Sequence, residues 1–375
     1  MADGFVSVLL AQYLTDLGFS GLQVGAIVTG TLLGSAALTL YTGLRWSHHD
    51  PRRILLGACV LMAATGLGFS TVTAFWPLFV VATVGTLNPS AGDVSVFLPI
   101  EQAAIAERTD ERWRPKRFAF YNLAGGLGGA AGALMSPIPG WLARRNGWDE
   151  ATTERRAFTV YIVAALVAAL IYRVLPAALH RVPSRRQPLK ESRTIVLRLA
   201  ALFSLDAAGG GFVLHAILVL YLHQRFGLDA PTLGFTLAAS TLLASFSQLA
   251  AAPLAARIGL VRTMVFTHLP ANVFLVLAGL APTAPLAITL LLLRASLSSM
   301  DVPARQALVM RLVPPDERAA AASITNVPRS LAAATTPALA GLLVDNSSIG
   351  WPLIMGGAMK ITYDLLLLAQ PLDRD

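Results

Sequence analysis

Long apolar runs separated by short polar gaps make up most of the sequence. A helix needs roughly 20 mostly apolar residues to cross a bilayer, whereas a transmembrane strand needs only about 10, so the run length favours helices over a barrel. The fourth and tenth runs are overlong, and they contain Pro89 and Pro99 in the fourth and Pro303 in the tenth, so we expect them to extend beyond the bilayer or to bend. The pattern predicts about twelve membrane-spanning helices, at residues 1–17, 22–44, 53–73, 76–106, 118–142, 156–176, 196–222, 231–256, 263–281, 284–312, 319–344 and 350–370.

Composition supports a membrane protein. Hydrophobic residues make up 55% of the chain and charged residues only 13%, with a mean hydropathy of +0.62. A soluble domain needs more polar residues to cover its surface. The net charge of +8 would suggest nucleic acid for a soluble protein, but the basic residues lie between the apolar runs. We therefore expect the lipid bilayer, and not nucleic acid, as a partner.

The positions of Lys and Arg predict the orientation. Basic residues collect in alternate loops, and the positive-inside rule places these loops and the C-terminus in the cytoplasm. The longest polar connection, HRVPSRRQPLKESR, follows the sixth span. We predict two six-helix bundles, residues 1–176 and 196–375, joined by a cytoplasmic linker at 177–195. The expected location is the cytoplasmic (inner) membrane. The loops assigned to the cytoplasm contain Arg52 and Arg53; Arg108, Arg112, Arg114, Lys116 and Arg117; Arg181, Arg185, Arg186, Lys190 and Arg193; Arg257 and Arg262; and Arg311 and Arg318.

The two halves share an ordered set of residues, which predicts an internal duplication. By this alignment the first span lacks roughly 15 residues and is short for a bilayer. A misassigned start codon is the simplest explanation, a genuine truncation is the second, and an accidental alignment is the third. The matched positions are Gly4, Tyr13, Gly18 and Gly25 against Gly211, Tyr221, Gly227 and Gly234, followed by Asp93, Gln102 and Asn122 against Asp301, Gln306 and Asn326.

Two loops resemble the signature of the major facilitator superfamily of secondary transporters, which is glycine followed by Leu-Ala-Asp-Arg, any residue, glycine and basic residues. PLAARIGLVR in the second half has Ala256 where the acidic residue belongs, and GLRWSHHDPRR in the first half has Asp50 displaced. The resemblance covers nearly the whole chain and implies transport by alternating access. The candidate loop-motif residues are Gly43, Asp50, Arg52, Arg53, Arg257, Gly259 and Arg262.

Four charged residues are candidates for a gate. Asp301 and Arg305 are one helical turn apart, and the resemblance implies that the cytoplasmic ends of the fourth, fifth, tenth and eleventh spans meet when the carrier faces outward. We therefore expect Glu101 and Asp301 to pair with Arg305 and Arg329 in that state. The alternative is a permanent structural bridge between Asp301 and Arg329.

Ionisable residues inside spans are costly and mark candidate functional sites. The candidates for proton coupling are Asp3, Asp93, Asp206 and His215, because a buried carboxylate can release its proton when it is rehydrated. His268, Arg294, Lys360 and Asp364 also lie within spans, without an assigned role.

Gly125, Gly128 and Gly132 have the spacing of a helix-packing surface. They also resemble the glycine-rich fifth span of exporters of this superfamily, which favours efflux.

Several classes of chemistry find no support in the sequence. There is no phosphate-binding loop, nucleophile elbow or HExxH motif, so we expect neither an enzyme nor a cofactor. Cys59 is the only cysteine, and His48 and His49 have no further ligands nearby, so no metal site is expected. The leading hypothesis is a monomeric, proton-coupled exporter of a small organic solute. The alternatives are an uptake carrier and a truncated, non-transporting protein with a binding or regulatory role.

Overall fold

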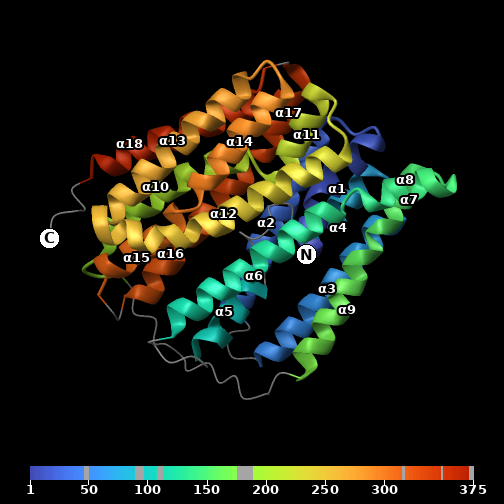
Figure 1. Cartoon of the computed structure of the whole chain (residues 1–375). Helices are drawn as coiled ribbons and strands as arrows, with labels where there is room; N and C mark the ends of the chain where they lie inside the picture. The colour runs from blue at the N-terminus through green and yellow to red at the C-terminus, as the bar shows by residue number, and fades with distance from the viewer. Residues whose placement is uncertain are drawn as a thin grey trace.

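The chain folds entirely into helices. The computed structural model describes residues 1–45, 50–88, 97–107, 113–174, 189–314, 317–347 and 349–370, and these residues form eighteen α-helices without a β-strand. Figure 1 shows the helices bundled along similar directions. Eight helical stretches within the described residues are long and apolar enough to cross a membrane, judged by length and composition. The other predicted spans coincide with shorter, interrupted or less apolar helices.

The first half contains nine helices among the described residues. They are α1 (Ala2–Asp16), α2 (Gly21–Arg45), α3 (Pro51–Thr71), α4 (Phe75–Val84), α5 (Phe97–Glu107), α6 (Arg114–Met135), α7 (Ile138–Asn146), α8 (Glu150–Ala157) and α9 (Thr159–Val174).

The second half also contains nine helices among the described residues. They are α10 (Arg193–Gly211), α11 (His215–Phe226), α12 (Ala230–Ile258), α13 (Leu260–Leu280), α14 (Ala284–Ser298), α15 (Asp301–Leu312), α16 (Arg318–Thr335), α17 (Pro337–Asn346) and α18 (Trp351–Leu368). The predicted linker falls largely on residues 175–188, which lie outside the described residues.

Five of the predicted spans are divided between two helices. Two breaks occupy equivalent places in the two halves, where Pro137 follows α6 and Pro337 opens α17. Proline fixes its own φ and has no N–H to donate, so it favours the start of a new helix over the continuation of an old one. The tenth span breaks between α14 and α15, as its proline predicted, and the seventh breaks after the glycines at 209–211.

The duplication predicted from the sequence is visible in the packing within each half. A Cβ at Gly4 would lie 2.0 Å from the carbonyl oxygen of Gly129 on α6, and one at Gly211 would lie 2.2 Å from that of Ala333 on α16. The two aligned glycines therefore have the same structural role in the two halves, because each lets its helix approach the backbone of a neighbouring helix. Gly18 and Gly227, also aligned, both have positive φ, at 81° and 64°.

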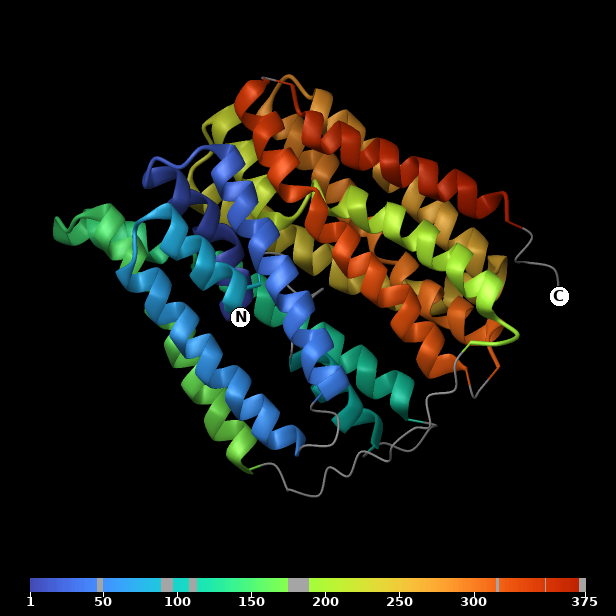
Figure 2. The same ribbon diagram turned by 180° about the vertical axis from the view of Figure 1, so that it is seen from behind.

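The same glycine pattern recurs where the halves meet. A Cβ at Gly25 on α2 would lie 2.2 Å from the carbonyl oxygen of Pro337, and one at Gly234 on α12 would lie 2.7 Å from that of Ala133 on α6. These contacts define two seams between the halves, α2 against α17 and α6 against α12, which are among the most extensive contacts between them. Figure 2 shows α2 running beside α16 and α17, and α5 and α6 have no extensive contact with α15 or α16 among the described residues. The glycine contacts at Gly25 and Gly234 lie near the starts of α2 and α12, and Ala133 lies near the end of α6, away from the end at which α6 and α16 begin.

The predicted glycine surface on α6 requires a correction. A Cβ at Gly132 would meet the carbonyl oxygen of Met1 at 1.9 Å, and one at Gly128 would lie 3.4 Å from the Met1 nitrogen, so both face α1. A Cβ at Gly125, however, would meet nothing within 4 Å. Gly126 takes its place in the packing, since a Cβ there would lie 1.9 Å from Ser245 Oγ of the other half. The error arose because spacing gives a helix face but not its direction.

A buried carboxylate ties the start of α10 to the loop before α16. Glu317 is 4% exposed, and its carboxylate accepts hydrogen bonds from the backbone N–H groups of Lys190 (2.9 Å), Glu191 (3.1 Å) and Ser192 (3.2 Å), and from the Ser192 hydroxyl. The N–H groups before a helix lack partners within it, and a negative charge there is favourable. The hydrogen bond from the Ser192 side chain, followed by those from the backbone, lowers the pKa of Glu317 to about 2.

Replacing Glu317 by glutamine should reduce the acid sensitivity of the fold. A carboxyl group with a lowered pKa stabilises the folded state above its ordinary pKa of about 4.5 and loses this contribution as the pH falls toward 2. Between these values the melting temperature of the wild type should therefore fall more steeply with decreasing pH than that of Glu317→Gln. Thermal unfolding in detergent at a series of pH values measures both slopes. Equal slopes would contradict the assignment.

Candidate functional site

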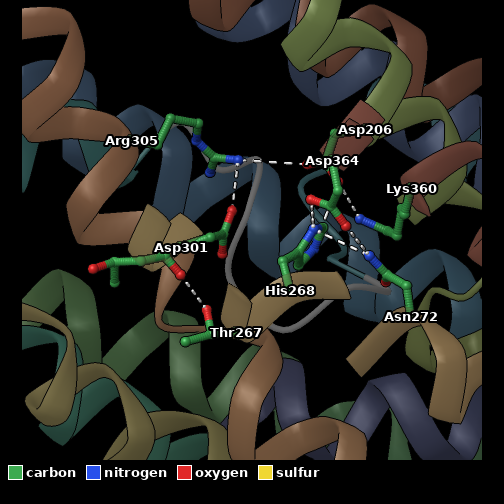
Figure 3. Close-up of polar contacts among 9 residues, drawn as sticks. Asp206, Thr267, His268, Asn272, Asp301, Arg305, Lys360 and Asp364 are labelled. Atoms are coloured by element: carbon green, nitrogen blue, oxygen red, sulfur yellow. Dashed lines mark hydrogen bonds and ion pairs between the residues drawn. The ribbon is translucent and has the colours of Figure 1, made fainter. Parts of the chain in front are cut away.

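Seven polar side chains meet in the interior of the second half, where Figure 3 shows them pointing toward one another. Each is at most 8% exposed. They come from α10, α13, α15 and α18, and we call them the charged cluster: Asp206, His268, Asn272, Asp301, Arg305, Lys360 and Asp364.

Asp206 on α10 lies at the centre of the charged cluster. Its Oδ1 accepts a hydrogen bond from Lys360 Nζ at 2.6 Å, and its Oδ2 lies 3.5 Å from Arg305 NH1. His268 Nε2 is a third neighbour, at 3.7 Å from Oδ1. A carboxylate removed from water needs such compensation, because burial alone strongly disfavours its charge.

Arg305 joins two carboxylates. Its NH1 lies 3.3 Å from Asp301 Oδ2, one turn earlier on α15, in addition to its contact with Asp206. Its guanidinium also lies over the ring of Phe203, 5.6 Å from the ring centroid. Asp301 begins α15, where the helix dipole adds to the stabilisation of its charge.

Asp364 on α18 has a different environment. Its Oδ1 lies 2.8 Å from His268 Nδ1, and its Oδ2 accepts a hydrogen bond from Asn272 Nδ2 at 2.9 Å. Asn272 Nδ2 also lies 3.1 Å from His268 Nδ1. Asp364 and Asn272 are both 0% exposed. The hydrogen-bond partners of Asp364 are thus an imidazole and an amide, and only the imidazole can carry a positive charge.

Other candidates from the sequence lie outside the charged cluster. The carboxylate of Asp3 is 2.8 Å from the hydroxyl of Tyr161, within the first half. His215 is the first residue of α11, next to the break in the seventh span. Asp93 lies outside the described residues.

The predicted gate is not formed in this conformation. Both carboxylate oxygens of Glu101 accept hydrogen bonds from tyrosines of its own half, Tyr121 and Tyr172. Asp301 contacts Arg305 in place of Arg329. Arg329 forms no ion pair with Asp301 or Glu101 among the described residues, and its Nε has no hydrogen-bond partner there. Of the expected gate contacts only that of Asp301 with Arg305 is therefore found among these residues, and the alternative Asp301–Arg329 bridge is not.

The loop-motif residues mark helix ends. The Asp50 carboxylate accepts a hydrogen bond from the backbone N–H of Arg52 at 3.0 Å and so caps α3. Gly259 separates α12 from α13 with φ of +90°, which favours glycine. The remaining motif residues lie in the last turns of helices or near their starts: Gly43, Arg53, Arg257 and Arg262.

Sequence reasoning gave no role to four members of the charged cluster, His268, Asn272, Lys360 and Asp364. The signal for them was helical spacing. His268 and Asn272 are four residues apart, as are Lys360 and Asp364, so each pair shares one face of its helix. Polar side chains on apolar helices require hydrogen-bond or ionic partners inside a membrane. The two pairs on two helices would therefore have predicted a contact between those helices.

Comparison with known proteins identifies the family. A model of the Major Facilitator Superfamily matches residues 1–213 and again residues 199–374. The chain therefore belongs to the major facilitator superfamily. The two matches confirm the resemblance noted in the loops, and the all-helical fold of two repeated halves is confirmed with it.

Individual relatives agree with this family. An uncharacterized membrane protein of Saccharomyces cerevisiae, YJR124C, is 26% identical and covers 98% of this chain and 90% of its own length. The inward open structure of the xylose transporter XylE from E. coli has a TM-score of 0.74 at 15% identity, covering 98% of this chain and 93% of that chain. The nucleoside transporter NupG has a TM-score of 0.70 at 12% identity, covering 98% and 94%. At these identities the structures are similar in fold alone.

Proposed function

We propose that this protein is a secondary active transporter that moves a small organic solute across a membrane by alternating access. The observation that carries the proposal is the uneven contact between the halves, which approach closely along two glycine seams toward one end. In transporters built from two parallel repeats, the solute site lies between the halves, and one half rocks against the other around it. Among the described residues these seams join the halves toward one end, and such an arrangement suits this motion.

A carboxylate strengthens the closed end. Asp345, near the end of α17, accepts hydrogen bonds from the backbone N–H groups of Gly21 (2.7 Å) and Leu22 (2.9 Å), the first two residues of α2 in the other half. It thus caps a helix 324 residues away in the sequence. This contact has to break if the halves separate at this end.

Replacing Asp345 by alanine should favour the state open at this end. Loss of a capping side chain costs about 0.5–2 kcal/mol, and here the cost falls only on the closed state. Spin labels at Leu33→Cys on α2 and Leu339→Cys on α17, in a Cys59→Ala background, report the distance between these two helices by pulsed electron double resonance. We expect a longer distance to gain population in Asp345→Ala.

The matched control for this prediction is Asp229→Ala. Asp229 caps α12 within its own half, through the N–H of Thr232 at 3.1 Å, so its loss should leave the label distances unchanged. If the label distances in Asp345→Ala are distributed as in the wild type, Asp345 does not stabilise the closed end.

For the energy source we propose protons. The support is the charged cluster, because ionisable groups inside a membrane are expensive and most often serve ion pathways. From the distribution of Lys and Arg we propose that the C-terminus is cytoplasmic. We also propose a monomer in the cytoplasmic (inner) membrane, in which the halves at 1–176 and 196–375, joined by the predicted linker at 177–195, move relative to one another.

For the direction we propose efflux, supported by the glycine-rich α6. Purified protein in liposomes with a trapped pH dye tests function and direction together. A panel of small sugars, nucleosides, amines and organic acids is added under an imposed pH gradient. Efflux predicts that protons and solute move in opposite directions, and uptake predicts movement in the same direction. Binding of a solute without flux would favour the binding or regulatory alternative.

A further inference from the structure

We infer that His268 and Asp364 together form a proton-binding site in the second half, while Asp206, the carboxylate first considered for this role, stays ionised as its counter-charge. The inference rests on the proposed proton coupling and assigns the site that carries the proton. It follows from the contrast between the two aspartates and from the position of the imidazole between them.

The partners of Asp206 hold it in the charged form. Lys360 Nζ at 2.6 Å and Arg305 NH1 at 3.5 Å are both cations. Opposite charges at such distances favour the ionised carboxylate against the effect of burial. Protonating Asp206 would leave Lys360 buried without its partner. Asp206 is therefore a poor site for a proton that must come and go.

The partners of Asp364 leave it without a fixed positive charge. Asn272 Nδ2 donates a hydrogen bond to its carboxyl group, His268 Nδ1 shares a second hydrogen bond with it, and its side chain is 0% exposed. Burial without a cation disfavours an ionised carboxylate. The proton of the pair is therefore retained on the carboxyl group of Asp364, where it can be shared with Nδ1 of His268.

The imidazole explains how that proton is linked to structure. His268 Nδ1 faces Asp364 at 2.8 Å, and Nε2 faces Asp206 at 3.7 Å. A neutral imidazole carries one N–H. If the pair loses its proton, one ring nitrogen presents a lone pair to an ionised carboxylate. The arrangement in this structure therefore fits the proton-loaded pair, and release of the proton favours separation of His268 from one of the two aspartates.

The other charged groups act in opposite directions on this site. Lys360 on α18, Arg305 on α15 and Arg294 on α14 are cations and would favour release, but they act on Asp206 and Asp301, whose negative charges favour retention. The ring of Tyr363 packs edge-on against His268, 6.0 Å between centroids, and contributes apolar surroundings. Among the described residues these cations and carboxylates therefore partly offset one another. A small movement of one helix then changes whether the proton is held.

A short contact route joins this site to the seam between the halves. Asp206 lies on α10, α10 packs along α16, and α16 contacts α2 of the first half. If α10 moves relative to α13, the movement can therefore be transmitted to α2 at the seam through α16 alone. The route gives the proton a way to influence which end of the carrier is closed.

Infrared difference spectroscopy of the purified protein in lipid membranes tests the site with the proton itself as the probe. As the pH is raised, the wild type should lose a carbonyl band of a protonated carboxyl group. Asp364→Asn should lack this band. His268→Gln should keep it with a shifted midpoint, because the carboxyl group remains while its hydrogen-bond partner changes. Asp229→Asn, which changes an exposed capping residue, is the control and should keep both band and midpoint.

Three results would overturn the inference. They are an unchanged band in Asp364→Asn, an unchanged midpoint in His268→Gln, and loss of the band in Asp229→Asn. If Asp364→Asn fails to fold, His268→Gln still decides the matter through its midpoint.

The liposome assay separates this inference from the proposed function. If Asp364 titrates in a wild-type protein that moves no solute, the proton site is supported and the proposed transport function is contradicted. If solute flux in Asp364→Asn stays coupled to pH, the transport function is supported and the role of Asp364 as the coupling group is contradicted.

Discussion

Replacing Lys360 by alanine should destabilise the folded protein by about 3–5 kcal/mol, the usual cost of removing one partner from a buried ion pair. The cause is the Asp206 carboxylate, whose nearest positive or ionisable neighbours among the described residues would then be Arg305 at 3.5 Å and His268 at 3.7 Å. Equilibrium unfolding by denaturant in detergent measures the loss, and the melting temperature should fall with it.

Two further variants make this prediction specific to the charge. Lys190→Ala removes an exposed lysine and should change stability by no more than about 0.5 kcal/mol. Lys360→Met combined with Asp206→Asn should recover most of the loss, because removing both charges leaves no unpaired ion. A double variant as unstable as Lys360→Ala would indicate that the lysine acts through packing.

Replacing Gly341 by alanine should shift the carrier toward the state open at the glycine seam. The added Cβ would lie 1.9 Å from the carbonyl oxygen of Gly21 in the other half, so the two backbones have to move apart. Overpacking of this kind costs about 1–3 kcal/mol, which corresponds to roughly a 5- to 150-fold change in the ratio of the two states. The label pair at positions 33 and 339 measures the shift.

The control for Gly341→Ala is Gly57→Ala. Gly57 lies in α3, and a Cβ there would meet nothing within 4 Å. Its replacement should leave the distance distribution as it is in the wild type. If Gly341→Ala gives the wild-type distribution as well, the seam tolerates the extra carbon and α2 against α17 is not a tight closure.

The sequence predicted the fold well because the bilayer imposes a simple rule. Every predicted span coincides with one or two helices, since a helix is the only open-ended structure that satisfies its backbone in lipid. The breaks were harder to foresee. Pro137 and Pro337 each lie near the predicted end of a span or inside one, and a proline inside a membrane helix can kink it or end it. Which outcome occurs depends on neighbouring helices.

The candidate site was only partly predictable from the sequence. Hydropathy located the ionisable residues within the spans, but the identity of each partner depends on how helices are placed around one another. Glu101 illustrates this limit, because its partners are Tyr121 and Tyr172 and not an arginine. A search of the sequence for oppositely charged residues would not have paired Glu101 with a tyrosine. Four-residue spacing on α13 and α18 was the one local signal of a shared polar face.

The confinement of the charged cluster to the second half has a consequence for the speed of turnover. Its ion pairs among the described residues join α10, α13, α15 and α18, so rocking one half against the other leaves these pairs together. Rocking therefore does not require these described ion pairs to be pulled apart at low dielectric, where such a separation is expensive. Unpacking the glycine seams and the helix end capped by Asp345 contributes to the barrier in its place, and we expect this part of the barrier to depend little on ionic strength.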